Sequence, residues 1–96
     1  MDGVSVLEVM GFSRWRPVYG RASIADLFKP QKRCGIYILR FSNSEFYVGQ
    51  ALDVTRRYAQ HRKTYSDIEE IAFKPVPRGK LDEEERSLIG HLEQKG

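Results

Sequence analysis

The stretch CGIYILRFSNSEFYVGQ, residues 34–50, decides the fold. Residues 35–41, GIYILRF, are rich in residue types that favour strands, and residues 45–51, EFYVGQA, read as the returning strand. Residues 42–44 are Ser-Asn-Ser, which is typical turn chemistry. The stretch therefore predicts a β-hairpin that carries two tyrosines, ten residues apart, each close to a glycine.

Alternation along the first strand predicts that both of its faces are apolar, so that the strand is covered on both sides. One face holds Ile36 and Ile38, and the other holds Tyr37, Leu39 and Phe41. The two tyrosines have two interpretations. Either they are packing residues, because aromatic side chains suit strands, or they belong to a catalytic site.

The register of the hairpin decides whether Tyr37 and Tyr47 share a face. If Phe41 faces Tyr47 across a five-residue loop, both tyrosines lie on one face. A two- or four-residue loop would place them on opposite faces, because the side-chain period of a strand is two.

The residues before the hairpin form an N-terminal segment with one helix signal. Ser23 is expected to cap a short helix over residues 24–28, which Pro30 ends. Phe12 and Trp15 are expected to pack against the rest of the domain.

The residues after the hairpin predict a helix, a strand and a second helix. Asp53 is a candidate N-cap for a helix over residues 54–63. Residues 68–76, IEEIAFKPV, predict a third strand, and two prolines near its end favour an edge position. Asp82 is a candidate N-cap for a last helix over residues 83–95.

The element order β-β-α-β-α predicts an α+β fold, with a small antiparallel three-stranded sheet flanked by helices. The 96 residues of the chain make one domain, which is large enough to fold without disulfides or a structural metal. We expect residues 1–32 to be an N-terminal extension that packs on the core, and residues 33–96 to be the core domain.

Composition and charge narrow the class of protein. The chain is 41% hydrophobic and 30% charged, which is ordinary for a globular domain. Residues 1–80 hold 14 Lys and Arg against 8 Asp and Glu, whereas residues 81–96 hold 2 against 5. A basic body with an acidic last helix suggests an anionic partner, and ordinary surface charge is the alternative.

Cysteine use and the N-terminal sequence bear on location. Cys34 is the single cysteine, so an internal disulfide and a cysteine-based zinc site are excluded. The sequence shows no signal peptide and no stretch long enough to span a membrane. We therefore expect an intracellular protein with no membrane partner, cytoplasmic or associated with the nucleoid.

Glu85 stands in line with the apolar stripe of the last helix. The stripe consists of Leu88, Ile89 and Leu92, which lie three, four and seven residues after Glu85. A carboxylate on that side is costly unless it is hydrogen-bonded, protonated or bound to a metal. The alternative is a capping box, because Glu85 would be residue N3 of a helix capped by Asp82.

Arg57 and His61 repeat this pattern on the preceding helix. Val54 and Tyr58 set the inner face, and Arg57 and His61 follow Val54 by three and seven residues. A structural histidine and a structural ion pair are the alternatives for these two residues. Two helices would thus each aim an ionisable side chain at a sheet that carries two tyrosines.

Together, these residues resemble the GIY-YIG nuclease domain over residues 33–95. Gly35-Ile36-Tyr37 matches the first of the family's two naming motifs, and Tyr47-Val48-Gly49 matches the second with Val for Ile. An arginine, a histidine and a glutamate follow in the family's order and at its spacing. In this sequence they are Arg57, His61 and Glu85.

The resemblance implies a metal-dependent endonuclease domain that hydrolyses phosphodiester bonds in DNA. Glu85 would hold one Mg²⁺ or Mn²⁺, which would stabilise the departing 3′-oxygen. Arg57 would bind a phosphate oxygen. Tyr37 or Tyr47 would position or deprotonate the water, although a phenol with a pKa near 10 needs that barrier lowered, and His61 is the alternative base.

Six further basic residues are predicted to contact the DNA backbone around the site. They are Arg56, Arg62, Lys63, Lys74, Arg78 and Lys80. The sequence shows no recognition helix or zinc module, so specificity is expected from further domains or a partner.

Two departures from the family pattern bear on activity. Gln50 stands where some members have a lysine that assists a tyrosine, and many members continue beyond the last helix to a Pro and an Asn. The sequence ends at Gly96, so that either this asparagine is absent or the sequence is a fragment of a longer chain.

Two other functions compete with the nuclease. The first is a non-catalytic module on the same fold that binds DNA or protein, in which Glu85→Ala leaves DNA binding intact. The second is a structural network of inward polar residues. There, Glu85→Ala or Arg57→Ala mainly lowers stability, by roughly 3–5 kcal/mol if half of a buried pair is stranded.

Overall fold

The computed structural model describes residue 7 and residues 9–95 of the chain. Its strands and helices are β1 (Arg16–Pro17), β2 (Gly35–Phe41), β3 (Phe46–Ala51), α2 (Val54–Thr64), β4 (Ile68–Pro75) and α3 (Leu81–Lys95). Short 3₁₀ turns cover Ala25–Leu27, Pro30–Lys32 and Arg78–Lys80. Within the described residues, no helix has the length and apolar character needed to cross a bilayer.

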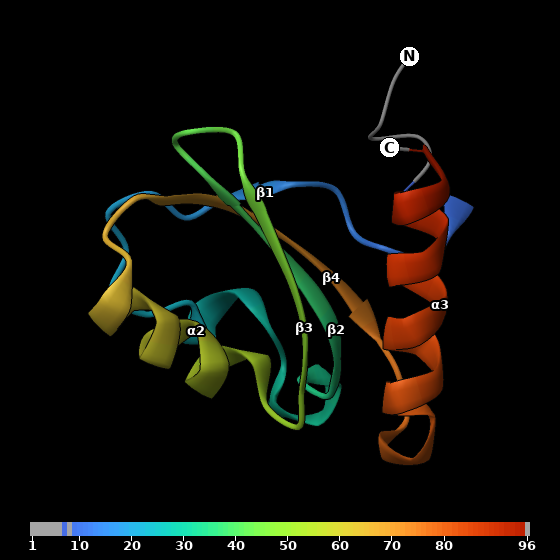
Figure 1. Ribbon diagram of the computed structural model, residues 1–96. Helices are drawn as coiled ribbons and strands as arrows, with labels where there is room; N and C mark the ends of the chain where they lie inside the picture. Colours follow the sequence, from blue (N-terminus) through green and yellow to red (C-terminus); the bar gives the residue numbers. More distant parts are fainter. Residues whose placement is uncertain (1–6, 8, 96) are drawn as a thin grey trace.

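The sheet is antiparallel, and its helices lie on opposite faces, α2 on one and α3 on the other (Figure 1). The strand order is β1-β4-β2-β3, so the described sheet has four strands and the prediction of three was wrong. The missed strand is β1, which pairs with β4 through Arg16↔Ile71 and Pro17↔Glu70. The predicted edge position of β4 was therefore also wrong. Pro75 pairs with Gly35 of β2 but lies beyond the two residues that pair with β1, and Pro77 follows the end of the strand.

The two tyrosines share a face of the hairpin, but the strands pair in a different register from the one considered above. Leu39, rather than Phe41, faces Tyr47, and Tyr37 faces Gly49. Both registers place Tyr37 and Tyr47 on one face, so the shared face is confirmed. The turn closes tightly through Ser44, whose φ of 70° is in the left-handed region.

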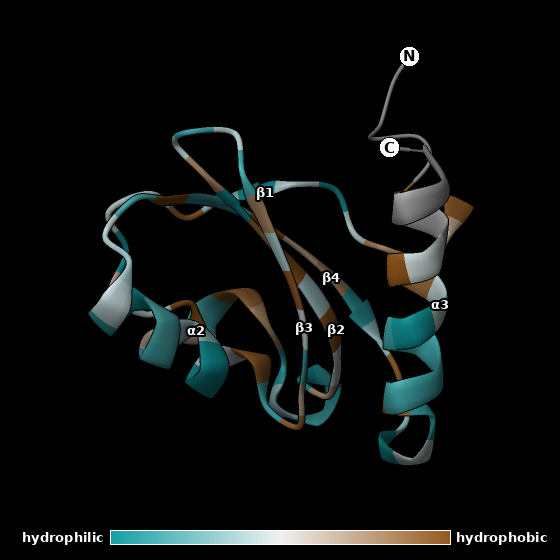
Figure 2. Ribbon diagram, in the orientation of Figure 1, coloured by the Kyte–Doolittle hydropathy of each residue, from teal (hydrophilic) through white to brown (hydrophobic). Residues whose placement is uncertain are grey.

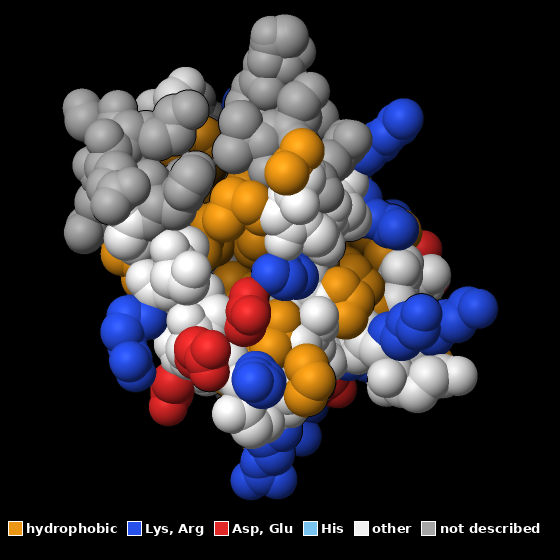
Figure 3. All heavy atoms as spheres, turned by 90° about the vertical axis from the view of Figure 1, so that its right-hand side faces the viewer, with side chains coloured by type: hydrophobic (Ala, Val, Ile, Leu, Met, Phe, Trp, Pro, Cys, Tyr) orange, Lys and Arg blue, Asp and Glu red, His pale blue; other side chains and the backbone are white. Residues whose placement is uncertain are grey.

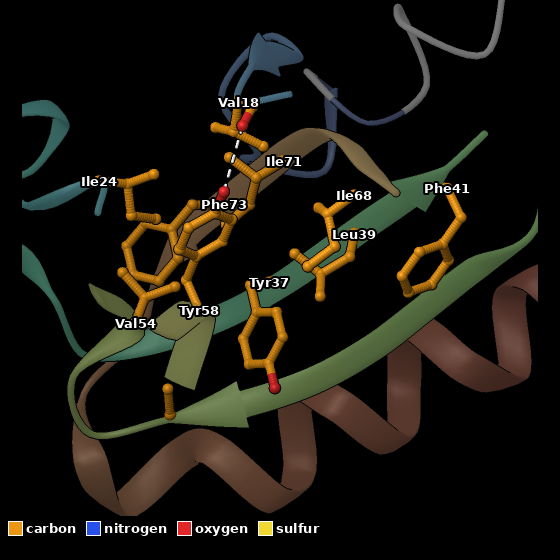
Figure 4. Close-up of a cluster of buried hydrophobic side chains, with 11 residues drawn as sticks. Val18, Ile24, Tyr37, Leu39, Phe41, Val54, Tyr58, Ile68, Ile71 and Phe73 are labelled. Atoms are coloured by element: carbon orange, nitrogen blue, oxygen red, sulfur yellow. Dashed lines mark hydrogen bonds between the residues drawn. The ribbon is translucent and has the colours of Figure 1, made fainter. Parts of the chain in front are cut away.

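The sheet separates two apolar clusters, as the alternation in β2 predicts. Tyr37, Leu39 and Phe41 face the α2 side, where they pack with Val54 and Tyr58 (Figure 4). Ile36 and Ile38 face α3 and pack with Leu81 and Leu88. In Figure 2 much of the brown lies on the strands, whereas α2 and the first turns of α3 are mostly teal.

The N-terminal segment packs on both faces of the sheet, with Phe12 and Trp15 on the α3 side and the residues from Val18 onward on the α2 side. Val18 and Ile24 are fully buried there. The Tyr58 hydroxyl donates to the carbonyl of Val18 at 3.1 Å, drawn as a dashed line in Figure 4, and to the carbonyl of Arg21 at 2.5 Å. The predicted helix over residues 24–28 is only a 3₁₀ turn over Ala25–Leu27, and its N-cap is Ile24, so the capping role predicted for Ser23 was wrong. The Ser23 hydroxyl still accepts from the backbone amide of Ala25, at 3.2 Å.

The predicted starts of the two helices had different outcomes. Asp53 caps α2 as predicted, because its carboxylate accepts from the Thr55 amide at 3.0 Å. The prediction for α3 was wrong, since the helix begins at Leu81 and Asp82 lies inside its first turn. The 3₁₀ turn Arg78–Lys80 leads directly into the helix, so the chain is already coiled before Asp82.

Candidate functional site

Gly49 gives Tyr37 its position. The two residues are cross-strand partners, and a Cβ at Gly49 would lie 2.6 Å from the Tyr37 hydroxyl and 3.0 Å from a ring carbon of Tyr47. Only glycine leaves this space open. The buried Tyr37 ring can therefore extend across the hairpin, with its hydroxyl directed toward β3 (Figure 4).

His61 completes an aromatic group with the two tyrosines. The Tyr37 hydroxyl lies 2.9 Å from His61 Nε2, within hydrogen-bond distance. The ring centroids of Tyr47 and His61 are 4.7 Å apart, and those of Tyr37 and Tyr47 are 6.0 Å apart. Tyr47 is 40% exposed, so this group connects the buried Tyr37 to solvent.

Burial shifts two pKa values at this group in opposite directions. Burial is the main cause that raises the pKa of Tyr37, and neighbouring Tyr47 adds to the rise. Burial also lowers the pKa of His61 below 6.5, and the positive charge of Arg57 lowers it further. Near neutral pH, Tyr37 therefore keeps its proton and His61 is uncharged. The rise at Tyr37 is opposite to what a tyrosine base would need.

Arg57 lines an open cleft whose lining includes neither tyrosine, nor His61, nor Glu85, although its charge acts on the pKa values of Tyr37 and His61. The cleft has a volume of about 640 Å³, and Arg56 and Arg78 line it together with Arg57. Arg57 is exposed rather than turned inward, and its Nη1 donates to Gln60 Oε1 at 3.3 Å. Among the described residues it forms no ion pair with a carboxylate, so the structural ion pair considered for it is not found there.

Glu85 reaches the site from α3. Its Oε1 accepts from Gln50 Nε2 at 2.6 Å, and the same Nε2 donates to Asp82 Oδ1 at 2.8 Å. Because α3 begins at Leu81, Glu85 is not residue N3 of a helix capped by Asp82, and the capping-box alternative was wrong. Of the predicted stripe, Leu88 is buried, Ile89 is 37% exposed, and the side chain of Leu92 is outside the described residues.

The charges of Glu85 and Arg57 act in opposite directions on the pKa of one tyrosine. Both act on the ionisation of Tyr37, where Glu85 raises its pKa and Arg57 lowers it. Gln50, which holds Glu85, belongs to β3, an edge strand of the sheet. The α3 carboxylate and the α2 side chains therefore approach the same tyrosine from opposite faces, at this edge.

The carboxylates at this edge suit a hard divalent cation. Glu85 is half-buried, and no described residue is hydrogen-bonded to its second oxygen, Oε2. No group of three or more His, Cys, Asp or Glu side chains able to hold a metal occurs among the described residues. A hard divalent cation is commonly held by one or two carboxylates with water filling the remaining positions, and Glu85, with Asp82 beside it, could supply these carboxylates.

The six basic residues predicted to bind DNA fall into two groups. Arg56 and Arg78 line the cleft, and Lys63 and Lys80 are exposed. Arg62 and Lys74 instead have partners within the fold. Arg62 Nε donates to the Arg21 carbonyl at 2.8 Å, and Lys74 Nζ pairs with Glu84 Oε1 at 2.7 Å. Figure 3 shows acidic side chains among basic ones on this α3 side of the molecule.

Sequence reasoning missed the role of Gln50 at this site. It noted only that Gln50 replaces a lysine that assists a tyrosine in some family members. Gln50 is the cross-strand partner of Ile36, and both lie on the α3 face, away from the tyrosines. The strand alternation was the signal that could have placed Gln50 near Glu85.

Comparisons with known proteins identify a family for this chain. A family model described as the GIY-YIG catalytic domain matches residues 33–95, which is most of the chain and includes each of the five residues above. No curated protein and no solved structure gave a significant match. The family consists of endonucleases. With its motifs in order along the matched region and its α+β fold, the chain belongs to the GIY-YIG catalytic domain family.

Proposed function

We propose that this chain is a metal-dependent endonuclease domain that cleaves phosphodiester bonds in DNA, with Tyr37, Tyr47, Arg57, His61 and Glu85 as its catalytic residues. One observation carries the proposal. The hydrogen-bonded Tyr37 and His61 lie beside exposed Tyr47, and the charges of Arg57 and Glu85 act on the pKa of Tyr37 in opposite directions.

Phosphate binding falls to the arginines of the cleft. Arg57 is exposed there without a carboxylate partner among the described residues, so its planar guanidinium is available to bind two phosphate oxygens. Arg56 and Arg78 add charge for the neighbouring phosphates. Positive charge fixed in place before the reaction stabilises the charge that develops on the phosphate in the transition state.

The proton path runs from water through Tyr37 to His61. A water at the exposed Tyr47 passes a proton to the Tyr37 oxygen, while Tyr37 gives its own proton to neutral His61 Nε2. The water oxygen bonds to phosphorus, the bond from phosphorus to the 3′-oxygen breaks, and that oxygen leaves with the electron pair. His61 is therefore the base, and Tyr37 relays the proton without being a stable tyrosinate.

Glu85 is the residue that would hold the cation, with Gln50 fixing its carboxylate through the 2.6 Å hydrogen bond. Bound Mg²⁺ or Mn²⁺ would supply positive charge for the departing 3′-oxygen. Sequence specificity would come from further domains or a partner. A DNA substrate also supports an intracellular location, in the cytoplasm or at the nucleoid.

The test of this function is plasmid nicking by the purified chain. Supercoiled DNA is incubated with Mg²⁺, Mn²⁺ or EDTA, and relaxed and linear products are quantified. We expect products with either metal and none with EDTA. If wild type binds DNA but never cuts it, with or without metal, the non-catalytic binding module replaces the nuclease.

The lowered pKa of His61 predicts the pH dependence of cleavage. Because the proposed base must be uncharged, kcat/KM should be level above pH 6.5 and should fall as the pH drops through the lowered His61 pKa. Folding stability should depend on pH in the same direction, falling in acid. A histidine whose pKa is depressed by folding contributes fully above its unfolded value, and that contribution is lost in acid.

Two substitutions at Arg57 test whether its positive charge lowers the pKa of His61. Arg57→Gln removes one cause of the low His61 pKa, so the acid limb of the residual activity should move to higher pH, whereas Arg57→Lys should leave the limb in place. Rates are compared between pH 4.5 and 8 at constant ionic strength. An acid limb that is unchanged in His61→Gln would assign the base to another group.

A further inference from the structure

The N-terminal segment, most of which precedes the family match, builds a second groove on the domain. The groove has a volume of about 410 Å³, and its walls come from residues 11–16 and 27–32. Phe73 and Pro75, at the end of β4, contribute from the sheet. It shares no lining residue with the cleft that holds Arg57.

The charged side chains that line this groove are all positive. Arg16, Lys29 and Lys32 line it, and no described lining residue is acidic. Residues 9–33 contain six Lys and Arg and one acid, Asp26, which is paired with Arg21. Lys29 and Lys32 are exposed and form no ion pair within the described part of the chain. The groove therefore offers three cations without a counter-charge from its own walls.

The cationic walls are held in place by the fold. Arg16 lies over the ring of Phe28, with its guanidinium carbon 5.7 Å from the ring centroid. Phe28 in turn packs edge-on against Phe73 at a centroid distance of 5.1 Å. On the other wall, the Ser13 amide donates to the Phe73 carbonyl at 2.8 Å, and the Phe73 amide donates to the Ser13 hydroxyl at 3.1 Å.

Arg33 fixes the segment that carries the two lysines. Its Nη2 donates to the carbonyls of Ala25 and Phe28, each at 3.1 Å. Its own carbonyl accepts from the Val54 amide at 2.8 Å, at the start of α2. The groove is thus connected to the same helix that carries Arg57. A surface organised before binding loses less entropy when it meets a ligand.

The two grooves lie at the same end of the sheet. Gly35, the first residue of β2, pairs with Ala51 on one side and with Pro75 on the other. Ala51 lines the cleft of the candidate site, and Pro75 lines the cationic groove. Two strand spacings are about 10 Å, which equals about three nucleotides along one DNA strand. A nucleic acid that crosses this end of the sheet can reach both.

We propose that the groove formed by Arg16, Lys29 and Lys32 binds the phosphate backbone of the DNA substrate, on one side of the scissile bond. The proposal rests on the nuclease function proposed above. It gives the N-terminal segment a role in substrate binding that is separate from the chemistry, since none of these residues touches the reacting group.

The test measures how DNA binding depends on salt. A labelled 20-base-pair duplex is titrated with protein in EDTA, between 50 and 200 mM salt, using fluorescence anisotropy. The variant carries Lys29→Gln and Lys32→Gln, which lie on the surface and should leave the melting temperature unchanged. The matched control is Arg86→Gln, because Arg86 is exposed on α3 and lines neither groove.

We expect the double variant to bind more weakly by on the order of tenfold or more, and the slope of log K against log salt to flatten by about 2. Arg86→Gln should leave that slope unchanged. With Mg²⁺, the double variant should cut with a raised KM and an unchanged kcat, because the groove contributes binding rather than chemistry.

The outcomes separate the two proposals. If wild type binds and cuts DNA but the double variant matches Arg86→Gln in affinity and slope, the groove proposal is overturned and an acidic protein segment becomes the better occupant. If wild type neither binds nor cuts, the nuclease function itself fails. The duplex can also be shortened on one side of the cut. If the double variant and wild type then bind it equally well, the groove contacts DNA on that side, as proposed.

Discussion

Replacing Glu85 by glutamine is expected to abolish metal-dependent nicking while leaving the fold intact. The amide oxygen of the substituted side chain can still accept the hydrogen bond from Gln50 Nε2, so the local contacts survive. The negative charge that would hold Mg²⁺ is lost. Losing a charge contact that acts on the transition state costs about 100-fold in rate or more. The readout is plasmid nicking with Mg²⁺ and Mn²⁺, beside thermal melting of the same preparation.

Glu83→Gln is the matched control for this experiment. Glu83 lies on the same helix, is exposed and lines neither groove, so its loss changes the net charge equally. It should cut at the wild-type rate. If Glu85→Gln instead cuts normally but melts far below Glu83→Gln, then Glu85 belongs to a structural network and the metal site is wrongly assigned. Equal cutting and equal melting in both variants would show that the nuclease activity is independent of Glu85.

The central elements of the fold could be predicted from local pattern because each carries its own signal. The hairpin has strand-forming residues around a polar turn, and α2 has a cap and an apolar face at Val54 and Tyr58. Strand β1 has no such signal. It is two residues long, and it is a strand only because Arg16 and Pro17 lie against β4, far away in the sequence. Such pairing depends on the tertiary structure and cannot be predicted from the local sequence pattern.

The start of α3 shows how residue type can mislead. Asp82 is a good capping residue in isolation, but the turn before it is already coiled, so the helix begins at Leu81. The shift removed the capping-box explanation for Glu85. Its stated alternative, a hydrogen-bonded carboxylate, is what the structure has, and the donor is Gln50.

The proximity of three of the candidate residues could be predicted from sequence, whereas their protonation could not. Motif order and strand parity brought Tyr37, Tyr47 and His61 together correctly. The pKa of Tyr37 depends on how deeply its hydroxyl is buried, and burial is set by packing across both strands and α2. Burial keeps the proton on Tyr37 and keeps His61 neutral, which is why we propose His61 rather than a tyrosine as the base.

Gly35→Ala is expected to destabilise the protein strongly, because the first glycine of the motif has no room for a side chain. A Cβ at Gly35 would collide with the backbone carbonyl of Lys74 and would lie 2.8 Å from a ring carbon of Phe73. Strand backbone cannot rotate away as a flexible side chain does. Overpacking of this kind costs about 3 kcal/mol or more, a large part of the roughly 5–15 kcal/mol that stabilises a domain. The melting temperature should therefore fall by at least about 10 °C.

Gly90→Ala, which also adds one methyl group, is expected to raise stability instead of lowering it. Gly90 lies inside α3, and apart from the adjacent helix backbone no atom of the described residues lies within 4 Å of a Cβ built there, so alanine should stabilise the helix by about 1 kcal/mol. Thermal melts of both variants are compared with wild type. Shifts of equal sign would mean that the close approach of β2 to β4 at Gly35 is wrong. Opposite shifts would show that this glycine is required by strand packing. In that case the motif serves the chemistry indirectly, by letting β2 sit close enough to β4 to hold Tyr37 over Gly49, where its hydroxyl meets His61.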